Sequence, residues 1–325
     1  MENSAINVLS SVLNMNEGDR VLVITDAGKI DIAEAFVKGA EELKASETKI
    51  YILHNKRPIK KVDTLLKKTI SENWGIIINA FEGYEDETPF RIKLLKKEIG
   101  TNARVGHAPG ITKEMLFNGS LSADYKKIRK NAEELIKILS NAKGLKIETN
   151  KGTDIYLDID SRGFQTDVYI QPGKFGNLPA GEIWCAPNEK LANGTIVVDG
   201  SIGDIGQVKK ELKIFVKDGK IKNLESDDKE LVNRIKKLVA IDKMASVIGE
   251  LGIGLNPNAR ISGNLLEDEK ALKTAHIAFG NNEEMQGGKN NSKTHRDFLF
   301  HNPTIEVEYG DGSKKAIMIN GLLLI

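Results

Sequence analysis

Apolar and polar residues alternate in two different ways along the chain. In the first half, short apolar runs at residues 19–25, 49–54, 75–81 and 103–109 are separated by segments with apolar residues at helical spacing. Such runs are typical of buried parallel strands joined by right-handed helical crossovers. We therefore expect a doubly wound α/β domain over residues 1–143. Its last helix should cover residues 123–142, with Gly144 as the C-terminal stop.

The second half has the period-two pattern of antiparallel strands. Hairpins are expected over residues 145–159, over 211–225 around Asp218-Gly219, and over 304–321 around residues 310–312. One helix is expected near residues 229–241. These patterns predict a mainly β (α+β) domain over residues 144–325, so the fold class of the chain is α/β with a second, β-rich metal-binding and catalytic domain.

Composition narrows the class of protein. The chain has 325 residues with 47 basic and 46 acidic side chains, which argues against a nucleic-acid surface. No stretch is apolar enough to cross a bilayer, and the first residues lack the basic start of a secretory signal. The single cysteine, Cys185, allows no intramolecular disulfide and reads as inert packing. We expect a cytoplasmic protein that binds neither nucleic acid nor membrane.

A nucleotide site is not expected in the first half. The segment after the first strand, DAGKID, has one glycine, and no strand is followed by a glycine-rich phosphate-binding motif. His54 and His107 close two of the strands at the edge where open sheets bind ligands. We interpret both as loop histidines without a ligand. If one of them does bind a ligand, His107 is the better candidate.

Candidate chemistry gathers between Glu250 and Asp297. His276 lies in the apolar run AHIAFG, and Glu250 lies between apolar, glycine-rich segments, where an unpaired charge is costly. His295 and Asp297 are two residues apart, so on an extended segment they point to one face. Each feature alone also fits a hydrogen-bonded pair or a core histidine. Together with the polar loop before His295, they favour a functional site.

Four ordered motifs carry a family resemblance. The segments GEIWCAPNE, ELGIGLNPN, HIAFG and THRDF resemble the P-x-G-E-V-x-x-A-P, E-L-x-x-G-x-N-P, H-I-A-x-G and H-x-D motifs of the aminopeptidase T family of metallo-exopeptidases. The resemblance implies a two-metal site and a peptide substrate, with a homodimer as the assembly. The metal ligands that it implies are Glu182, Glu250, His276, His295 and Asp297.

The resemblance also implies catalytic roles. Glu250 would bridge two divalent ions, and a carboxylate and imidazole set without thiolate suits Zn, Co, Mn or Fe. A tyrosine expected seven residues after the H-I-A-x-G histidine is replaced here by Glu283. If Glu283 points inward, it would serve as a catalytic base or a further ligand.

A second resemblance leaves an alternative open. The loop GNNEEMQGGKNNSKTHRD is similar to that of the 2,5-dihydroxypyridine dioxygenases, which bind one iron through two histidines and an aspartate. In that case His276, His295 and Asp297 would hold a single Fe²⁺. The acids Glu182 and Glu250 favour the peptidases, whereas the loop favours the dioxygenases. A degenerate member without activity is the third alternative.

Overall fold

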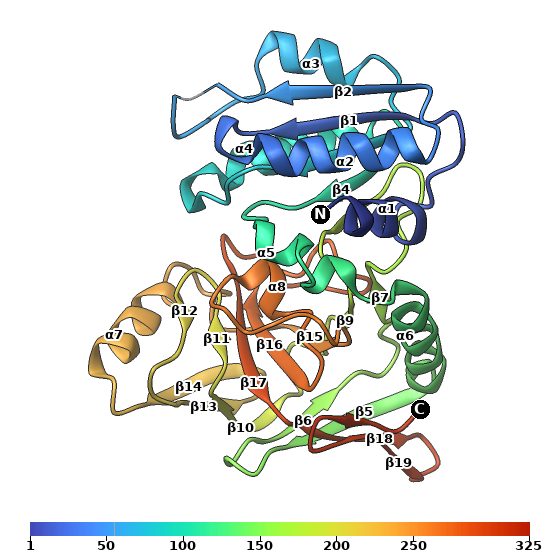
Figure 1. Ribbon diagram of the computed structural model, residues 1–325. Coiled ribbons are helices and arrows are strands. Elements are labelled where there is room, and N and C mark those ends of the chain that lie inside the picture. The colour runs from blue at the N-terminus through green and yellow to red at the C-terminus, as the bar shows by residue number, and fades with distance from the viewer. Residues whose placement is uncertain (55) are drawn as a thin grey trace. The chain divides into compact units, whose positions relative to one another are not determined.

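The computed structural model describes residues 1–54 and 56–325, which form two compact units (Figure 1). One unit comprises Met1–Arg129, Asp167–Gly181 and Asn256–Arg260, and the other comprises Lys130–Thr166, Glu182–Leu255 and Ile261–Ile325. The domain boundary expected at residues 143 and 144 stays a prediction. Within the described ranges no helix combines the length and the apolar character needed to span a membrane.

The first unit is built on a parallel sheet, as the alternation of apolar runs and helices predicts. All its neighbouring strands are parallel. Their order is β2 (Glu47–Ile52), β1 (Arg20–Thr25), β3 (Ile76–Ala80), β4 (Arg104–His107) and β8 (Phe175–Asn177). The β8 strand comes from the second half of the sequence, where its three residues carry too little pattern to reveal a partner.

Helices α2 (Ile30–Glu42), α3 (Thr64–Ile70) and α4 (Thr88–Ile99) cover the parallel sheet. Two further helices, α1 (Glu2–Ser11) and the short α5 (Lys113–Leu116), contact each other, and α1 packs against α2. Leu22 and Ile77 of the sheet share a buried cluster with Leu66 of α3 and Phe90 of α4, whereas α2 packs against β1 and β2. The N-terminus of α3 is fixed by Asp63, whose carboxylate accepts a hydrogen bond from the Leu66 amide.

One predicted helix end is wrong. The helix expected over residues 123–142 forms as α6 (Tyr125–Leu139), but Gly144 lies inside β5 (Ala142–Glu148) and does not terminate the helix. Gly144 pairs with Asp158 of β6 (Asp154–Asp158), and a Cβ at this position would collide with the ring of Tyr156. The glycine is therefore explained by a close cross-strand approach.

The second unit contains an eight-stranded antiparallel sheet in which the three expected hairpins form. Its order is β14 (Lys220–Glu225), β13 (Leu212–Lys217), β10 (Asn193–Val198), β6, β5, β18 (Thr304–Tyr309), β19 (Lys314–Ile319) and β20 (Leu322–Leu323). Asp218 and Gly219 turn between β13 and β14 with positive φ angles of 51° and 70°, as a two-residue hairpin requires. The expected helix forms as α7 (Lys229–Leu238).

A seven-stranded antiparallel sheet completes this unit and contains all the residues implied as metal ligands (Figure 1, where its strands β15, β16 and β17 are orange to red). Its order is β12 (Gly206–Gln207), β11 (Ser201–Ile202), β17 (His295–His301), β16 (Thr274–Gly280), β15 (Ile248–Gly254), β9 (Glu182–Cys185) and β7 (Gln165–Thr166). Every residue of β15 and β16 is buried. The short helix α8 (Leu265–Asp268) precedes β16.

Candidate metal centre

Strand register places the expected ligands on one face of the seven-stranded sheet. Glu250 of β15 lies opposite Ala278 of β16, which lies opposite Asp297 of β17. Residues directly opposite each other share a face, as do residues two apart on one strand. His276, two residues before Ala278, and His295, two residues before Asp297, therefore point to the same side as Glu250.

The fourth strand adds Glu182 to this face, and small residues leave room for the ligands. Glu182 of β9 lies opposite Gly254 of β15, and Gly252 lies opposite His276. A Cβ on Gly252 would overlap the imidazole of His276. Glycine at this position is therefore what allows the histidine ring to lie flat over the neighbouring strand.

His295 is oriented by the polar loop that precedes it. Its Nδ1 lies 2.7 Å from the carbonyl oxygen of Asn281, so the Nδ1–H group donates to that carbonyl. The other nitrogen, Nε2, lies 3.0 Å from Glu250 Oε2 and 3.4 Å from Asp297 Oδ1. This backbone acceptor fixes the tautomer in which Nε2 is available to bind a metal.

His276 is fully buried and faces three carboxylates. Its Nε2 lies 3.5 Å from Glu182 Oε2, 3.6 Å from Glu250 Oε1 and 4.0 Å from Asp297 Oδ1. Among the described residues, neither of its ring nitrogens has a hydrogen-bond partner. A buried imidazole surrounded in this way calls for a proton or a metal ion between it and the carboxylates.

Two groups of three residues have ligand atoms close enough to hold a metal. In each group, one ligand atom per residue lies within 4.8 Å of the others. The first group is Glu182, Glu269 and His276, and the second is Glu250, His295 and Asp297. Glu250 connects them, because its Oε1 faces His276 and its Oε2 faces His295. The two groups thus form one continuous centre.

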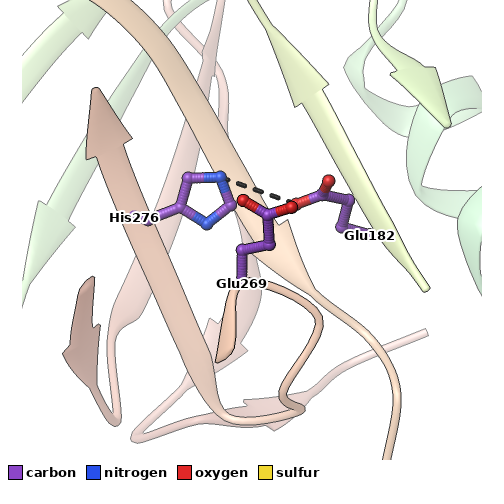
Figure 2. Close-up of side chains that lie close together, drawn as sticks. All are labelled: Glu182, Glu269 and His276. Carbon is purple, nitrogen blue, oxygen red and sulfur yellow. Dashed lines mark ion pairs between the residues drawn. The ribbon is translucent and has the colours of Figure 1, made fainter. Parts of the chain in front are cut away.

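The sequence reasoning missed Glu269. Figure 2 shows its carboxylate beside the carboxylate of Glu182 and the imidazole of His276, although it comes from the segment between α8 and β16. The run LEDEK offers three acids in a row, and spacing alone does not distinguish them. Asp268, for example, points elsewhere and accepts hydrogen bonds from the Ser262 and Gly263 amides.

Lys270 enters the same centre. Its side chain is fully buried, and Nζ forms ion pairs with Glu182 and, at 2.8 Å, with Glu269 Oε1. Glu283, in contrast, is exposed in the turn after β16 and lies outside both groups. Cys185 is buried in β9, where burial raises the pKa of its thiol well above the usual value.

The region matched by a family model covers this centre. Residues 115–322, more than half of the chain, match the model described as thermophilic metalloprotease (M29). The chain belongs to the M29 family. The curated relatives are more distant: aminopeptidase PepS of Streptococcus thermophilus is 26% identical over an alignment of 166 residues, and the alignment covers 45% of this chain and 39% of the relative.

A second curated relative of this M29 chain is the 2,5-dihydroxypyridine 5,6-dioxygenase of Pseudomonas putida. It is 24% identical over an alignment of 200 residues, and the alignment covers 57% of this chain and 55% of the relative. The chain thus matches less than two thirds of the length of either curated relative.

Solved structures share the fold over nearly the whole chain. The dihydroxypyridine dioxygenase of Pseudomonas putida KT2440 matches with a TM-score of 0.75 at 18% identity, covering 99% of this chain and 96% of its own. AmpT from Thermus thermophilus matches with a TM-score of 0.72 at 15% identity, covering 100% of this chain and 98% of its own. These matches confirm the α/β fold with its antiparallel second part, as expected from the hydrophobic pattern.

The donor set of the M29 chain fits a divalent metal. Burial lowers the pKa of His276, but the carboxylates of Glu250, Glu182 and Asp297 outweigh it and raise the pKa to about 9. Burial is likewise outweighed at His295, where Asp297 and Glu250 raise the pKa well above its usual value. The centre therefore attracts positive charge, and oxygen and imidazole donors without thiolate suit hard to borderline cations.

His107, the other histidine considered from the sequence, has a different setting. Its Nδ1 lies 3.2 Å from Asn79 Nδ2 inside the first unit, and its ring packs edge-on against Phe81. Burial, with the charge of Arg91, lowers its pKa to about 3. His107 is thus a neutral packed histidine, whereas His54 is exposed.

Proposed function

We propose that this protein is a metal-dependent aminopeptidase that removes N-terminal residues from small peptides at a two-metal centre. The observation that carries the proposal is the position of Glu250. One of its oxygens faces His276 of the first group and the other faces His295 of the second, at 3.6 and 3.0 Å. A carboxylate placed in this way suits a bridge between two ions.

The remaining ligands divide between the two ions. Glu182, Glu269 and His276 would hold one ion, and His295 and Asp297 the other, with Glu250 shared between them. Bound ions of Zn, Co, Mn or Fe would polarise the scissile carbonyl and lower the pKa of a water nucleophile towards about 7. Glu250 and His276 are shielded from bulk water, since β15 and β16 are buried throughout.

The aminopeptidase assignment is supported by family membership and by the chemistry of the ligands. A relative is named aminopeptidase PepS, and the matched model describes a metalloprotease. We propose that the free N-terminal amine of the substrate binds one of the two ions, which would distinguish an aminopeptidase from an endopeptidase. We further propose that the protein works as a cytoplasmic homodimer.

The assay compares a free with a blocked N-terminus. After loading with Co²⁺, Mn²⁺ or Zn²⁺, aminoacyl p-nitroanilides and dipeptides should be hydrolysed, whereas the N-acetylated forms should not. A Glu250→Ala variant should lose at least 100-fold in kcat/KM, since it removes the shared ligand. Its metal content should fall from two ions per chain to one or none. Equal cleavage of blocked and free substrates would contradict the proposal.

Glu283 requires its own test as the proposed base. The side chain is exposed, so it would have to turn inward when substrate binds. A lower kcat with unchanged metal content in Glu283→Gln would support this role. Unchanged activity would reject it, and Glu284→Gln is the matched control because that neighbour is also exposed in the same turn.

A second function, ring cleavage by a single-iron dioxygenase, is favoured by one observation. Asp297 Oδ1 faces both His276 and His295, at 4.0 and 3.4 Å, so two histidines and one aspartate converge. A relative is named 2,5-dihydroxypyridine 5,6-dioxygenase. One iron per chain, insensitive to Glu250→Ala, together with oxygen consumption on hydroxylated pyridines, would establish this alternative. Absence of bound metal would indicate a degenerate member.

A further inference from the structure

The two ligand groups differ by one buried cation. Lys270 has a fully buried side chain whose Nζ pairs with one oxygen, Oε1, of both Glu182 and Glu269. Glu182 Oε2 is directed instead at His276 Nε2, 3.5 Å away. The ammonium group thus holds the outer oxygens of the two carboxylates and leaves the first group (Glu182, Glu269 and His276) oriented around His276.

Formal charges follow from these contacts. With neutral imidazoles, the first group has two carboxylates and one ammonium, and therefore a net charge of −1. The second group (Glu250, His295 and Asp297) has two carboxylates, a net charge of −2, and no lysine or arginine ion pair to Glu250 or Asp297 among the described residues. A divalent ion in the first group is repelled by the adjacent Lys270 ammonium, whereas Glu250 and Asp297 of the second group have no such cation paired with them among the described residues.

We propose that Lys270 is a built-in cation that lowers the metal affinity of the first group. The protein then binds one divalent ion tightly at the second group and a second ion weakly at the first. Lys270 is a positioning residue, because it acts through Glu182 and Glu269 rather than on substrate. The inference rests on the proposed metal centre, and it adds an order of filling that the proposed function does not require.

If the second group fills before the first, the number of bound ions depends on the metal concentration. At low metal concentration the chain would contain one ion, held by Glu250, His295 and Asp297. The second ion would then be exchanged readily, so that the fully loaded state depends on the free metal concentration. Lys270 suits this purpose, because its side chain is fully buried and ion-paired with both Glu182 and Glu269.

The test measures metal binding directly. Metal-free protein is titrated with Mn²⁺ and Co²⁺ by calorimetry, and the bound ions are counted by elemental analysis. Wild-type protein should show a first ion with a dissociation constant at least tenfold below that of the second. Lys270→Met should tighten the weaker ion by about tenfold or more, because a like charge is removed beside it.

Matched variants separate charge from folding. Lys270→Arg keeps the cation and should retain the two-step isotherm. Lys29→Met is the control: Lys29 is also buried and ion-paired, with Glu82 in the first unit, and its loss should leave both steps unchanged.

If Lys270→Met does not fold, the titration of wild-type protein and of histidine variants still tests the order in which the two groups fill. His295→Ala should then abolish the tight step, and His276→Ala the weak one. Two steps of equal affinity in wild-type protein, or a Lys270→Met isotherm identical to wild type, would overturn the role of Lys270 while leaving the two-metal function intact. Absence of any bound ion would overturn the proposed function itself.

Discussion

At the scale of single residues, the metal centre depends on the absence of a side chain at one position as well as on the ligands. His276 can lie across β15 only because Gly252 opposite it has no side chain. The ligands themselves are costly to bury, since four carboxylates (Glu182, Glu250, Glu269 and Asp297) surround one lysine and two histidines. Their burial is explained by cations: protons on the histidines, Lys270, or metal ions.

The role of Gly252 can be tested by one methyl group. Gly252→Ala should displace the His276 ring, weaken metal binding by at least tenfold and lower the free energy of unfolding by about 1–3 kcal/mol, as overpacking does. Calorimetric metal titration and urea unfolding measure both effects. Gly28→Ala is the control, because a Cβ there meets no atom within 4 Å; unchanged metal binding in Gly252→Ala would contradict this account.

At the scale of elements, packing selects between equally plausible sequence patterns. The α4 helix packs on the parallel sheet with Glu98 fully buried, and Asn79 of β3 donates to its Oε2 at 2.9 Å. Burial raises the pKa of Glu98 to about 8, so it is mostly protonated at neutral pH. A residue that reads as a charged helix position is in fact a neutral member of the core.

This contact predicts a pH dependence of stability. The folded-state pKa of Glu98 lies above the usual value of 4.5, so protonated Glu98 contributes to the free energy of unfolding at low pH. This contribution is lost as the pH rises through about 8. His107 nearby acts in the opposite direction, but only below about pH 6.5. Between pH 6.5 and 8.5, Glu98→Gln should therefore flatten the decline of unfolding free energy, by at most about 1.4 kcal/mol per pH unit.

Chemical denaturation across this range provides the measurement. Glu42→Gln is the matched control, because Glu42 is exposed at the end of α2 and should leave the pH profile as it is in wild type. A Glu98→Gln profile parallel to wild type would show that Glu98 is ionised in the folded protein.

At the scale of the whole molecule, every candidate ligand belongs to the unit that contains the antiparallel sheets. Metal should therefore protect one unit selectively. In hydrogen exchange, saturating Mn²⁺ should slow the amides of β9, β15, β16 and β17, whereas those of β1 and β3 should change little. At a Mn²⁺ concentration of 100 times its dissociation constant, metal binding stabilises the folded state by about 2.7 kcal/mol. Equal protection of both units would contradict this expectation.

Hydrophobic periodicity determined the local structure of this protein. Four of the five strands of the parallel sheet, the helices between them and the three hairpins form where the pattern predicts, because burial on one or both faces restricts the residue type at each position. Sequence motifs alone were sufficient to identify the family; they surround Glu182, Glu250, His276, His295 and Asp297. The helix end at Gly144 was not predictable, because a glycine that ends a helix and one that admits a cross-strand tyrosine look alike in sequence.

Only the tertiary structure decided which polar side chains meet. The register of β9, β15, β16 and β17 places Glu182, Glu250, His276 and Asp297 on one face, and no local pattern encodes which strands are neighbours. Glu269 and Lys270 enter the centre from a segment outside the sheet, next to Asp268, which points elsewhere. Their direction follows from long-range packing. The sequence thus supplies the ligand types, and the three-dimensional contacts decide the composition and charge of the site.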